Sequence, residues 1–184
     1  MIAKGLDFPL VSLVGVINAD TILNFPDFRS SERTYQMLSQ VSGRAGRGNI
    51  KGDVIIQTFN PDNYSIELSK THNYVDFFNK EIKIRKDLKY PPYYFISLIK
   101  IGSKDYNLSL SESKKIANYI KENISEDMIV LGPSVAGVSR VNKIYYFQII
   151  IKFRNKEKMR EILNNVSDLE NNNKVSISID INPC

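Results

Sequence analysis

The stretch KYPPYYFISLIKI at residues 89–101 is where the pattern of the sequence changes. Upstream of it, apolar residues recur at helical spacing over 75–85, which predicts a helical arm. The proline pair at 91–92 cannot continue a helix, because each ring removes an amide donor and clashes with the preceding turn. Residues 93–101 then have the composition of a strand. The expected boundaries are therefore 61–92 for a helical connector and 93–184 for a further domain.

Four strands and two helices are predicted after residue 92. Their order is strand, helix, strand, strand, helix, strand. This order is typical of a four-stranded antiparallel sheet with both helices on one face, the α+β arrangement called ferredoxin-like. The expected elements are strands at 93–101, 129–139, 144–153 and 175–181 and helices at 107–123 and 156–169.

The predicted helix at 156–169 has one apolar face and one basic face. Its apolar stripe consists of Met159, Ile162, Leu163, Val166 and Leu169. Lys156 and Arg160 are one turn apart and fall outside this stripe. We expect both cations to be exposed and available to a partner.

The first 60 residues predict a different architecture, an α/β layer. A buried strand at 11–17, a helix at 31–42 and a strand at 54–59 alternate, as in a parallel α/β domain. The unpaired strand edges of such a partial sheet favour strand exchange or dimerisation.

In the connector that follows, Glu81 and Arg85 have the i,i+4 spacing of a helical ion pair. On an exposed face such a pair is worth only about 0.2–0.5 kcal/mol, so its expected role is positional.

The segment QVSGRAGRG at residues 40–48 places Arg44 and Arg47 at the end of the predicted helix. Glycines at 43 and 46 are expected to let the backbone turn where a side chain would obstruct it. A guanidinium presents a planar fork of donors that matches phosphate oxygens, which favours contact with the γ-phosphate of a nucleotide. The alternative is that the arginines only complement the helix dipole and that Gly46 ends the helix.

Basic residues are concentrated near the C-terminal end. The chain carries 25 Lys and Arg against 20 Asp and Glu, a net charge of +5, which permits nucleic-acid binding without requiring it. Between 140 and 160, seven cations accompany the single acid Glu157, and we expect them to contact an acidic partner. They are Arg140, Lys143, Lys152, Arg154, Lys156, Lys158 and Arg160.

Three aromatic residues, at 145–147, lie within this basic stretch. They either form a stacking surface for bases or alternate into a core, and the second interpretation is favoured.

Several classes of site are not expected in this sequence. One cysteine, Cys184, excludes a disulfide framework and a zinc site built from cysteine pairs. His72 is the single histidine and is expected to be a surface loop residue. No apolar run reaches the length of a membrane span and no signal peptide is evident, so a cytoplasmic protein is expected.

The first part of the chain resembles motifs V and VI of superfamily 2 helicases. MIAKGLDFP at 1–9, FPDFRSSERTYQMLSQVSGRAGRG at 25–48 and GDVIIQTFNPDNY at 52–64 carry the resemblance, specifically to the replication-restart helicase family PriA, or primosomal protein N′. EIKIRKDLKYPPYYF at 81–95 and SIDINP at 178–183 fit the C-terminal domain of that family more loosely. Asn63 departs from the family pattern, which more often has histidine there.

This resemblance implies that residues 1–60 are the back half of the second RecA-like lobe of a motor that uses ATP and Mg²⁺. It implies that Arg47 is an arginine finger and Arg44 its companion, with Gln40, Gly43 and Asp7 also at the nucleotide. Lys4 and Gly5 would approach DNA, as would Arg140 and Lys143 in the second domain. The family's zinc-binding insertion lies upstream, so no metal is expected on this chain.

The partners implied by the resemblance are branched or single-stranded DNA, single-stranded DNA-binding protein and other primosome proteins. Lys156 and Arg160 are the candidates for the acidic tail of single-stranded DNA-binding protein.

The 184 residues contain no GxxxxGK[ST] loop and no acidic Mg²⁺ motif, so this chain alone is expected not to hydrolyse ATP. The alternative function is a non-catalytic adaptor that binds nucleic acid or protein.

Overall fold

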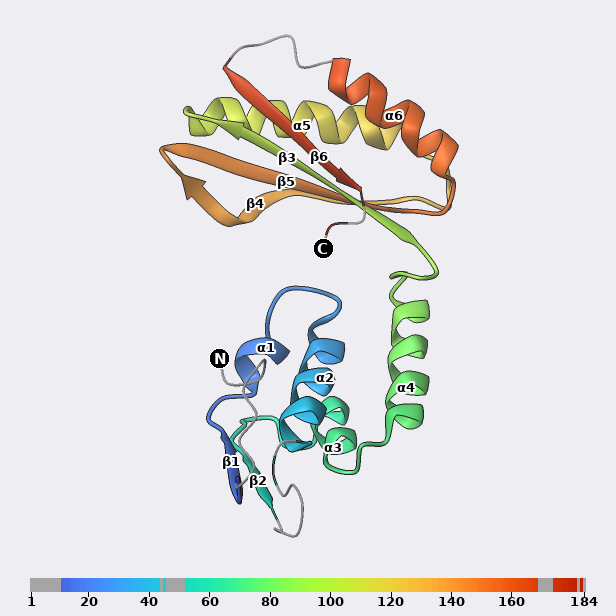
Figure 1. Cartoon of the computed structure of the whole chain (residues 1–184). Coiled ribbons are helices and arrows are strands. Elements are labelled where there is room, and N and C mark those ends of the chain that lie inside the picture. Colours follow the sequence, from blue (N-terminus) through green and yellow to red (C-terminus); the bar gives the residue numbers. More distant parts are fainter. Residues whose placement is uncertain (1–10, 44, 46–51, 169–173, 182, 184) are drawn as a thin grey trace. The chain divides into compact units, whose positions relative to one another are not determined.

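The computed structural model describes residues 11–43, 45, 52–168, 174–181 and 183 (Figure 1). The chain divides into two compact units, residues 1–85 and residues 86–184. Each unit combines helices with a sheet, so the expected mixed α/β class is confirmed. The division into three domains predicted from the sequence stays a prediction.

The first unit is built on two parallel strands, β1 and β2, paired from Leu13 with Asp53 to Val16 with Ile56. Its small core consists of Ala19, Leu38 and Ile66, with Val16, Leu23, Met37 and Ile56 packed around them. The elements are β1 (Leu13–Val16), α1 (Asp20–Leu23), α2 (Ser30–Ser42), β2 (Asp53–Ile56), α3 (Tyr64–Lys70) and α4 (Tyr74–Asp87).

The two strands of the first unit are not buried on both faces. Exposure alternates along each strand, and the side chains of Leu13 and Ile55 are 57% and 61% exposed. The expectation of a buried strand over 11–17 is therefore wrong for one face. The physical reason is that the core of this unit packs against one face of the two-stranded sheet only, the face that carries Val16 and Ile56.

Helix α3 lies inside the predicted helical connector at 61–92, where no separate helix at these residues was predicted, and Asn63 explains why it begins at Tyr64. The Asn63 side chain accepts hydrogen bonds from the Ser65 amide at 3.0 Å and from the Ser65 hydroxyl at 2.6 Å. Asparagine is among the preferred residues at this capping position because its oxygen satisfies an amide that the helix leaves unpaired.

The second unit is a four-stranded sheet in the order β4-β5-β3-β6, and every neighbouring pair is antiparallel. Figure 1 shows both helices of this unit on the same side of the sheet. The elements are β3 (Phe95–Ser103), α5 (Tyr106–Asn123), β4 (Ile129–Val141), β5 (Ile144–Phe153), α6 (Lys156–Asp168) and β6 (Val175–Ile181).

The core of the second unit lies between the sheet and its helices. Alternate residues of the two central strands point into it, including Ile99, Ile101, Ile149 and Ile151, which have no exposed surface. The predicted apolar stripe of α6 joins this core through Met159, Ile162, Leu163 and Val166. Leu169 lies outside the described residues. Within the part of the chain that the structure describes, no helix has the length and apolar character needed to cross a membrane.

Strands β4 and β5 form a hairpin whose turn is Asn142 and Lys143. Both residues have positive φ, 49° and 66°, as in a two-residue turn whose twist matches that of the flanking strands. Strand β4 is irregular, with register shifts between Leu131 and Ser134 and between Val135 and Arg140.

Candidate functional site

Helix α2 leads into the predicted nucleotide-contacting segment. Gln40 lies in its last turn with an exposed side chain, and Gly43 follows as the C-cap residue. Arg44 and Arg47, like Lys4, Gly5 and Asp7, lie outside the described residues. The roles assigned to all seven residues therefore stay predictions.

The expectation that a side chain at position 43 would obstruct the turn of the backbone is wrong. Gly43 has φ −68°, which any residue adopts, and a Cβ there would lie 3.6 Å from the Ser39 carbonyl oxygen, an ordinary contact. The helix end therefore does not require glycine at this position.

His72 lies beside the end of α2. Its side chain is exposed, as expected, and its Nε2 lies 3.2 Å from the Ser42 hydroxyl. This contact ties the loop after α3 to the last residue of α2.

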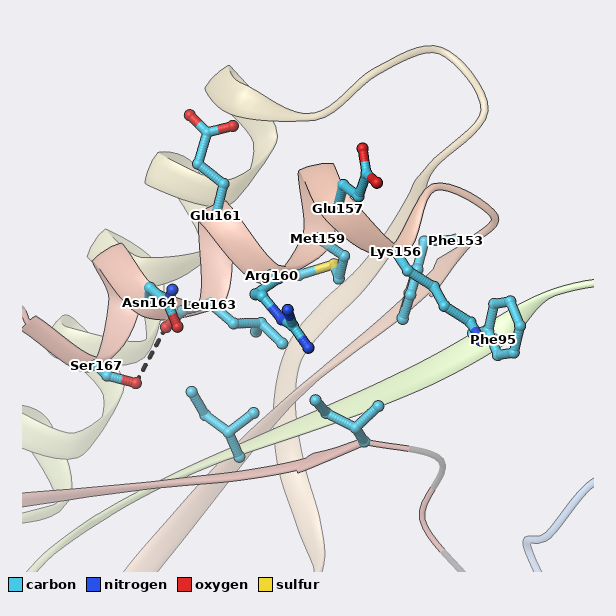
Figure 2. A pocket seen from close by; sticks show the side chains of 12 residues that line it. Phe95, Phe153, Lys156, Glu157, Met159, Arg160, Glu161, Leu163, Asn164 and Ser167 are labelled. Atoms are coloured by element: carbon cyan, nitrogen blue, oxygen red, sulfur yellow. Dashed lines mark hydrogen bonds between the residues drawn. The ribbon is translucent and has the colours of Figure 1, made fainter.

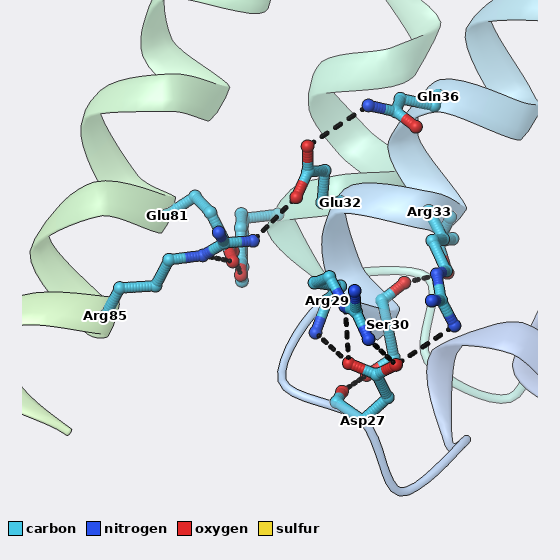
Figure 3. A network of polar contacts seen from close by, with 10 residues as sticks. Asp27, Arg29, Ser30, Glu32, Arg33, Gln36, Glu81 and Arg85 are labelled. Carbon is cyan, nitrogen blue, oxygen red and sulfur yellow. Dashed lines mark hydrogen bonds and ion pairs between the residues drawn. The ribbon is translucent and has the colours of Figure 1, made fainter. Parts of the chain in front are cut away.

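A polar network connects α4 to the beginning of α2 (Figure 3). Arg85 donates from Nε to Glu81 Oε1 at 2.7 Å and from Nη2 to Glu32 Oε2 at 2.7 Å. The expected Glu81–Arg85 pair is thus present, but it is not on an exposed face, since the side chains of Arg85 and Glu81 are only 14% and 9% exposed. Burial on its own lowers the pKa of Arg85, and the two carboxylates outweigh it and raise that pKa.

Tyr64 joins the same network from α3. Its hydroxyl donates to Glu81 Oε2 at 2.5 Å, and its ring stacks on Phe77 with the centroids 5.8 Å apart. Burial, together with this hydrogen bond to a carboxylate, raises the pKa of Tyr64 to about 12. Helices α2, α3 and α4 therefore share one buried polar cluster next to an aromatic one.

We expect the first unit of the wild type to lose stability in alkali, and we expect Tyr64→Phe to lose less. The pKa of Tyr64 is raised in the fold, so its contribution is complete below the unfolded value of 10.0 and is lost as pH rises from there to about 12. Urea-induced unfolding followed by far-ultraviolet circular dichroism at each pH measures the free energy of unfolding. The wild-type value should decrease over that interval more steeply than that of the variant, and equal slopes would contradict the prediction.

Asp27 organises the entry to α2. Its carboxylate accepts from Arg29 Nη2 at 2.9 Å and lies 3.1 Å from Arg33 Nη1 (Figure 3). Burial opposes ionisation, but the hydrogen bonds and charge of these arginines prevail and lower the pKa of Asp27. Arg29 and Arg33, two arginines of the segment at 25–48, thus hold the beginning of α2 through Asp27.

Asp20 is a buried carboxylate that sequence reasoning missed. It follows β1 and accepts from three residues after β2: the Thr58 hydroxyl at 3.1 Å, the Phe59 amide at 2.9 Å and the Asn60 side chain at 2.7 Å. These hydrogen bonds, that of Asn60 first, lower the pKa of Asp20. The carboxylate thereby connects the segment that follows β1 to residues 58–60, which follow β2, at the carboxyl ends of the two parallel strands.

The β4–β5 hairpin presents the two cations predicted to approach DNA. Arg140 and Lys143 are both exposed, and the Arg140 guanidinium lies 4.8 Å from the ring centroid of Tyr145. Of the neighbouring aromatic residues, Phe147 is buried, as the core interpretation predicts, whereas Tyr146 is half-buried and packs over Gly102, where a Cβ would lie 2.6 Å from the tyrosine Cε1. The hairpin is therefore a basic projection in which Tyr145 and Tyr146 are half-buried.

A groove of about 870 Å³ runs between α6 and the edge strand β6 (Figure 2). Its apolar lining includes Met159 and Leu163 of α6 and Ile179 and Ile181 of β6. Lys156 and Arg160, the two cations predicted to meet a partner, both line it. Figure 2 shows Arg160 pointing into the groove and the end of Lys156 against Phe95, with the ammonium 4.2 Å from the ring centroid.

One residue of the predicted basic surface is not on the surface. Lys152 is only 7% exposed, and its ammonium donates to the Leu88 carbonyl oxygen at 2.8 Å and lies 3.5 Å from the ring centroid of Tyr90. Desolvation lowers the pKa of Lys152, and the charge of Lys89 lowers it further. No local sequence pattern indicates these contacts, because they join residues more than 60 positions apart.

No group of three or more histidine, cysteine, aspartate or glutamate side chains in the described ranges is arranged to hold a metal ion.

Comparison with known proteins supplies the family. Replication restart protein PriA from Bacillus subtilis is 44% identical over 188 residues, which include 100% of this chain and 23% of that protein. The protein of the same name from Synechocystis is 41% identical over 83% of this chain and 18% of its own length, and that from Borreliella burgdorferi is 35% identical over 100% of this chain and 28% of its own length. The chain thus spans about a quarter or less of the first of these relatives.

Among solved structures, the de novo designed protein Foldit4 aligns with a TM-score of 0.37 and 16% identity, over 50% of this chain and 98% of that one. A score this low carries no argument about fold or function. Residues 86–184 match the family model described as the primosomal protein N C-terminal domain. The chain belongs to the PriA family of primosomal proteins.

Proposed function

We propose that this chain is part of an ATP-dependent DNA helicase that acts in replication restart and primosome assembly. The observation that carries the proposal is the similarity to proteins named for replication restart over the full chain. In this proposal, the parallel strands and helices of the first unit are the back half of a RecA-like lobe. The second unit, whose strand order is β4-β5-β3-β6, is a ferredoxin-like domain.

In the proposed motor, Arg47 stabilises the charge that develops on the γ-phosphate, with Arg44 and Gln40 beside it. A guanidinium suits this role because it stays charged and its donors match the geometry of phosphate oxygens. Asp7 holds a ribose hydroxyl or an arginine, while Lys4 and Gly5 approach a DNA phosphate. Support comes from α2, which ends beside this segment and is held at its other end by the buried Arg85 network.

The second unit is proposed to contact DNA through Arg140 and Lys143. Support comes from their exposure at the end of the hairpin, next to or within its two-residue turn. Neither cation has a carboxylate partner among the ion pairs of the described residues. Such cations bind phosphate by releasing counterions, so this contact should weaken steeply with salt.

The groove between α6 and β6 is proposed to take the acidic tail of single-stranded DNA-binding protein. Support comes from its chemistry: Lys156 and Arg160 face an apolar floor that includes Leu163 and Ile179. An acidic peptide that ends on an apolar residue would place its carboxylates on the cations and its last side chain on the floor.

Two charge-reversal variants test these contacts and serve as controls for each other. Arg140→Glu with Lys143→Glu should weaken binding of a labelled DNA fork about tenfold or more and leave binding of an acidic tail peptide unchanged. Lys156→Glu with Arg160→Glu should weaken the peptide about tenfold or more, because the variant removes charge-assisted hydrogen bonds. Both variants change the net charge equally. If each variant lowered both affinities by the same factor, separate sites would be contradicted.

A further inference from the structure

A second basic surface forms where residues 88–94 meet the end of β5. Its exposed cations are Lys89 and Arg154, its third cation, Lys152, is buried, and its rings are those of Tyr90 and Tyr94. Lys89 and Arg154 share one ring, with the Lys89 ammonium 5.8 Å and the Arg154 guanidinium 4.7 Å from the Tyr94 centroid. Lys152 lies 3.5 Å from the Tyr90 centroid. We call these five residues the tyrosine-backed cluster.

The positive charge of this cluster is not neutralised within the described part of the chain. None of its three cations takes part in an ion pair there, and the acids nearest in sequence, Asp87 and Glu157, take part in none either. Contacts with rings stabilise cations but leave their net charge unchanged. Desolvation lowers the pKa of Lys152 most, and repulsion by the charge of Lys89 lowers it further.

The architecture holds these charges in place. The Lys152 ammonium donates to the Leu88 carbonyl oxygen, and the buried ring of Tyr94 contacts both Arg154 and Lys89, which are exposed. Helix α6 begins two residues after Arg154, at Lys156, so the positive end of a 13-residue helix lies next to the cluster. A preorganised cluster of this kind costs little further entropy when it binds an anion.

We propose that the tyrosine-backed cluster binds the phosphodiester backbone of DNA without reading its bases, an inference that rests on the DNA contact in the proposed function and adds a second contact surface to it. Lys89 and Arg154 are exposed and can reach phosphates, while the rings of the cluster already carry the protein's own cations, so base stacking is not its mode of contact.

A nucleic acid fits this surface better than an acidic peptide. None of the five residues lines the apolar groove between α6 and β6, so the cluster lacks the apolar floor that would hold a peptide side chain. Binding through phosphates alone should be independent of base sequence and steeply dependent on salt.

The test compares two double variants of the 184-residue chain that remove the same amount of charge. Lys89→Gln with Arg154→Gln removes the exposed cations of the cluster, and Lys114→Gln with Lys121→Gln removes two exposed cations of α5 as a control. Fluorescence anisotropy with labelled oligonucleotides of two unrelated sequences, single-stranded and duplex, gives the affinity between about 50 and 200 mM salt. Lys89→Arg with Arg154→Lys keeps the charges and should bind as the wild type does.

The cluster variant should bind about tenfold or more weakly than the control, equally for both sequences. Its slope of log affinity against log salt on duplex should be less steep by about 0.9 for each phosphate that the variant no longer neutralises. Equal affinity and slope in the two variants, with binding by the wild type retained, would overturn the cluster and leave the proposed function intact. No binding by the wild type would overturn both. Loss of binding to poly-glutamate but not to DNA would overturn the proposal in favour of an acidic protein partner.

Discussion

Arg85→Met is expected to destabilise the first unit by about 3 kcal/mol, the lower end of the range for removing one partner of a buried ion pair. The methionine retains most of the apolar stem but leaves Glu81, only 9% exposed, without its cation. The cost stays at the lower end because Glu32 is more than a third exposed and can be solvated. The variant also removes the ion pair that joins α4 to Glu32 of α2, the helix that precedes the arginine segment.

Hydrogen exchange of the amides of α2 and α4 measures this cost without requiring the two units to unfold together. Arg85→Met with Glu81→Gln is the matched variant. It removes the buried charge along with its partner, and the amide oxygen can still accept from Tyr64. The double variant should therefore be more stable than Arg85→Met alone. A cost below about 1 kcal/mol for the single variant would show that the network contributes no more than a surface pair.

Gly132→Ala is expected to destabilise the second unit by about 3 kcal/mol, the sum of strain in an unfavourable backbone conformation and of overpacking. Gly132 has φ 101°, where residues with a Cβ are strained, and an added Cβ would lie 2.8 Å from the backbone oxygen of Gln148. That atom belongs to a central strand and cannot move as a flexible side chain would.

Gly137→Ala is the control for this variant, because it lies on the same strand and an added Cβ would meet nothing within 4 Å. Hydrogen exchange of the β3 and β5 amides should increase for Gly132→Ala and change little for Gly137→Ala. Equal protection in the two variants would contradict the steric argument.

The second unit was predicted from the sequence better than the first. Strands at 144–153 and 175–181 have the predicted bounds, and the bounds of the other elements of that unit agree within two residues. A mainly aliphatic and aromatic run predicts the strand at 144–153, alternation of apolar and polar residues predicts the strand at 175–181, and an apolar stripe predicts α6, because all three patterns are local. In the first unit, α3 depends on one capping residue, Asn63, whose role could have been found from the local sequence NYSIEL.

Contacts between distant residues could not be predicted. The Glu81–Arg85 pair has a sequence signal, but its extension to Glu32 and Tyr64 depends on how three helices pack. In the same way, a count of cations between 140 and 160 does not distinguish the buried Lys152 from the exposed Arg154. Only folding brings residues 88–94 against the end of β5 and creates the tyrosine-backed cluster.

The most direct test of the proposed function is DNA-stimulated ATP hydrolysis by a chimera. In this chimera, the 184-residue chain replaces the matching segment of the Bacillus subtilis relative. We predict that Arg47→Ala lowers turnover by about 10³-fold, the effect of losing an arginine finger, while affinity for DNA at fixed salt is unchanged. Turnover equal to that of the unsubstituted chimera would contradict the account, leave QVSGRAGRG as the end of a helix, and favour the adaptor function.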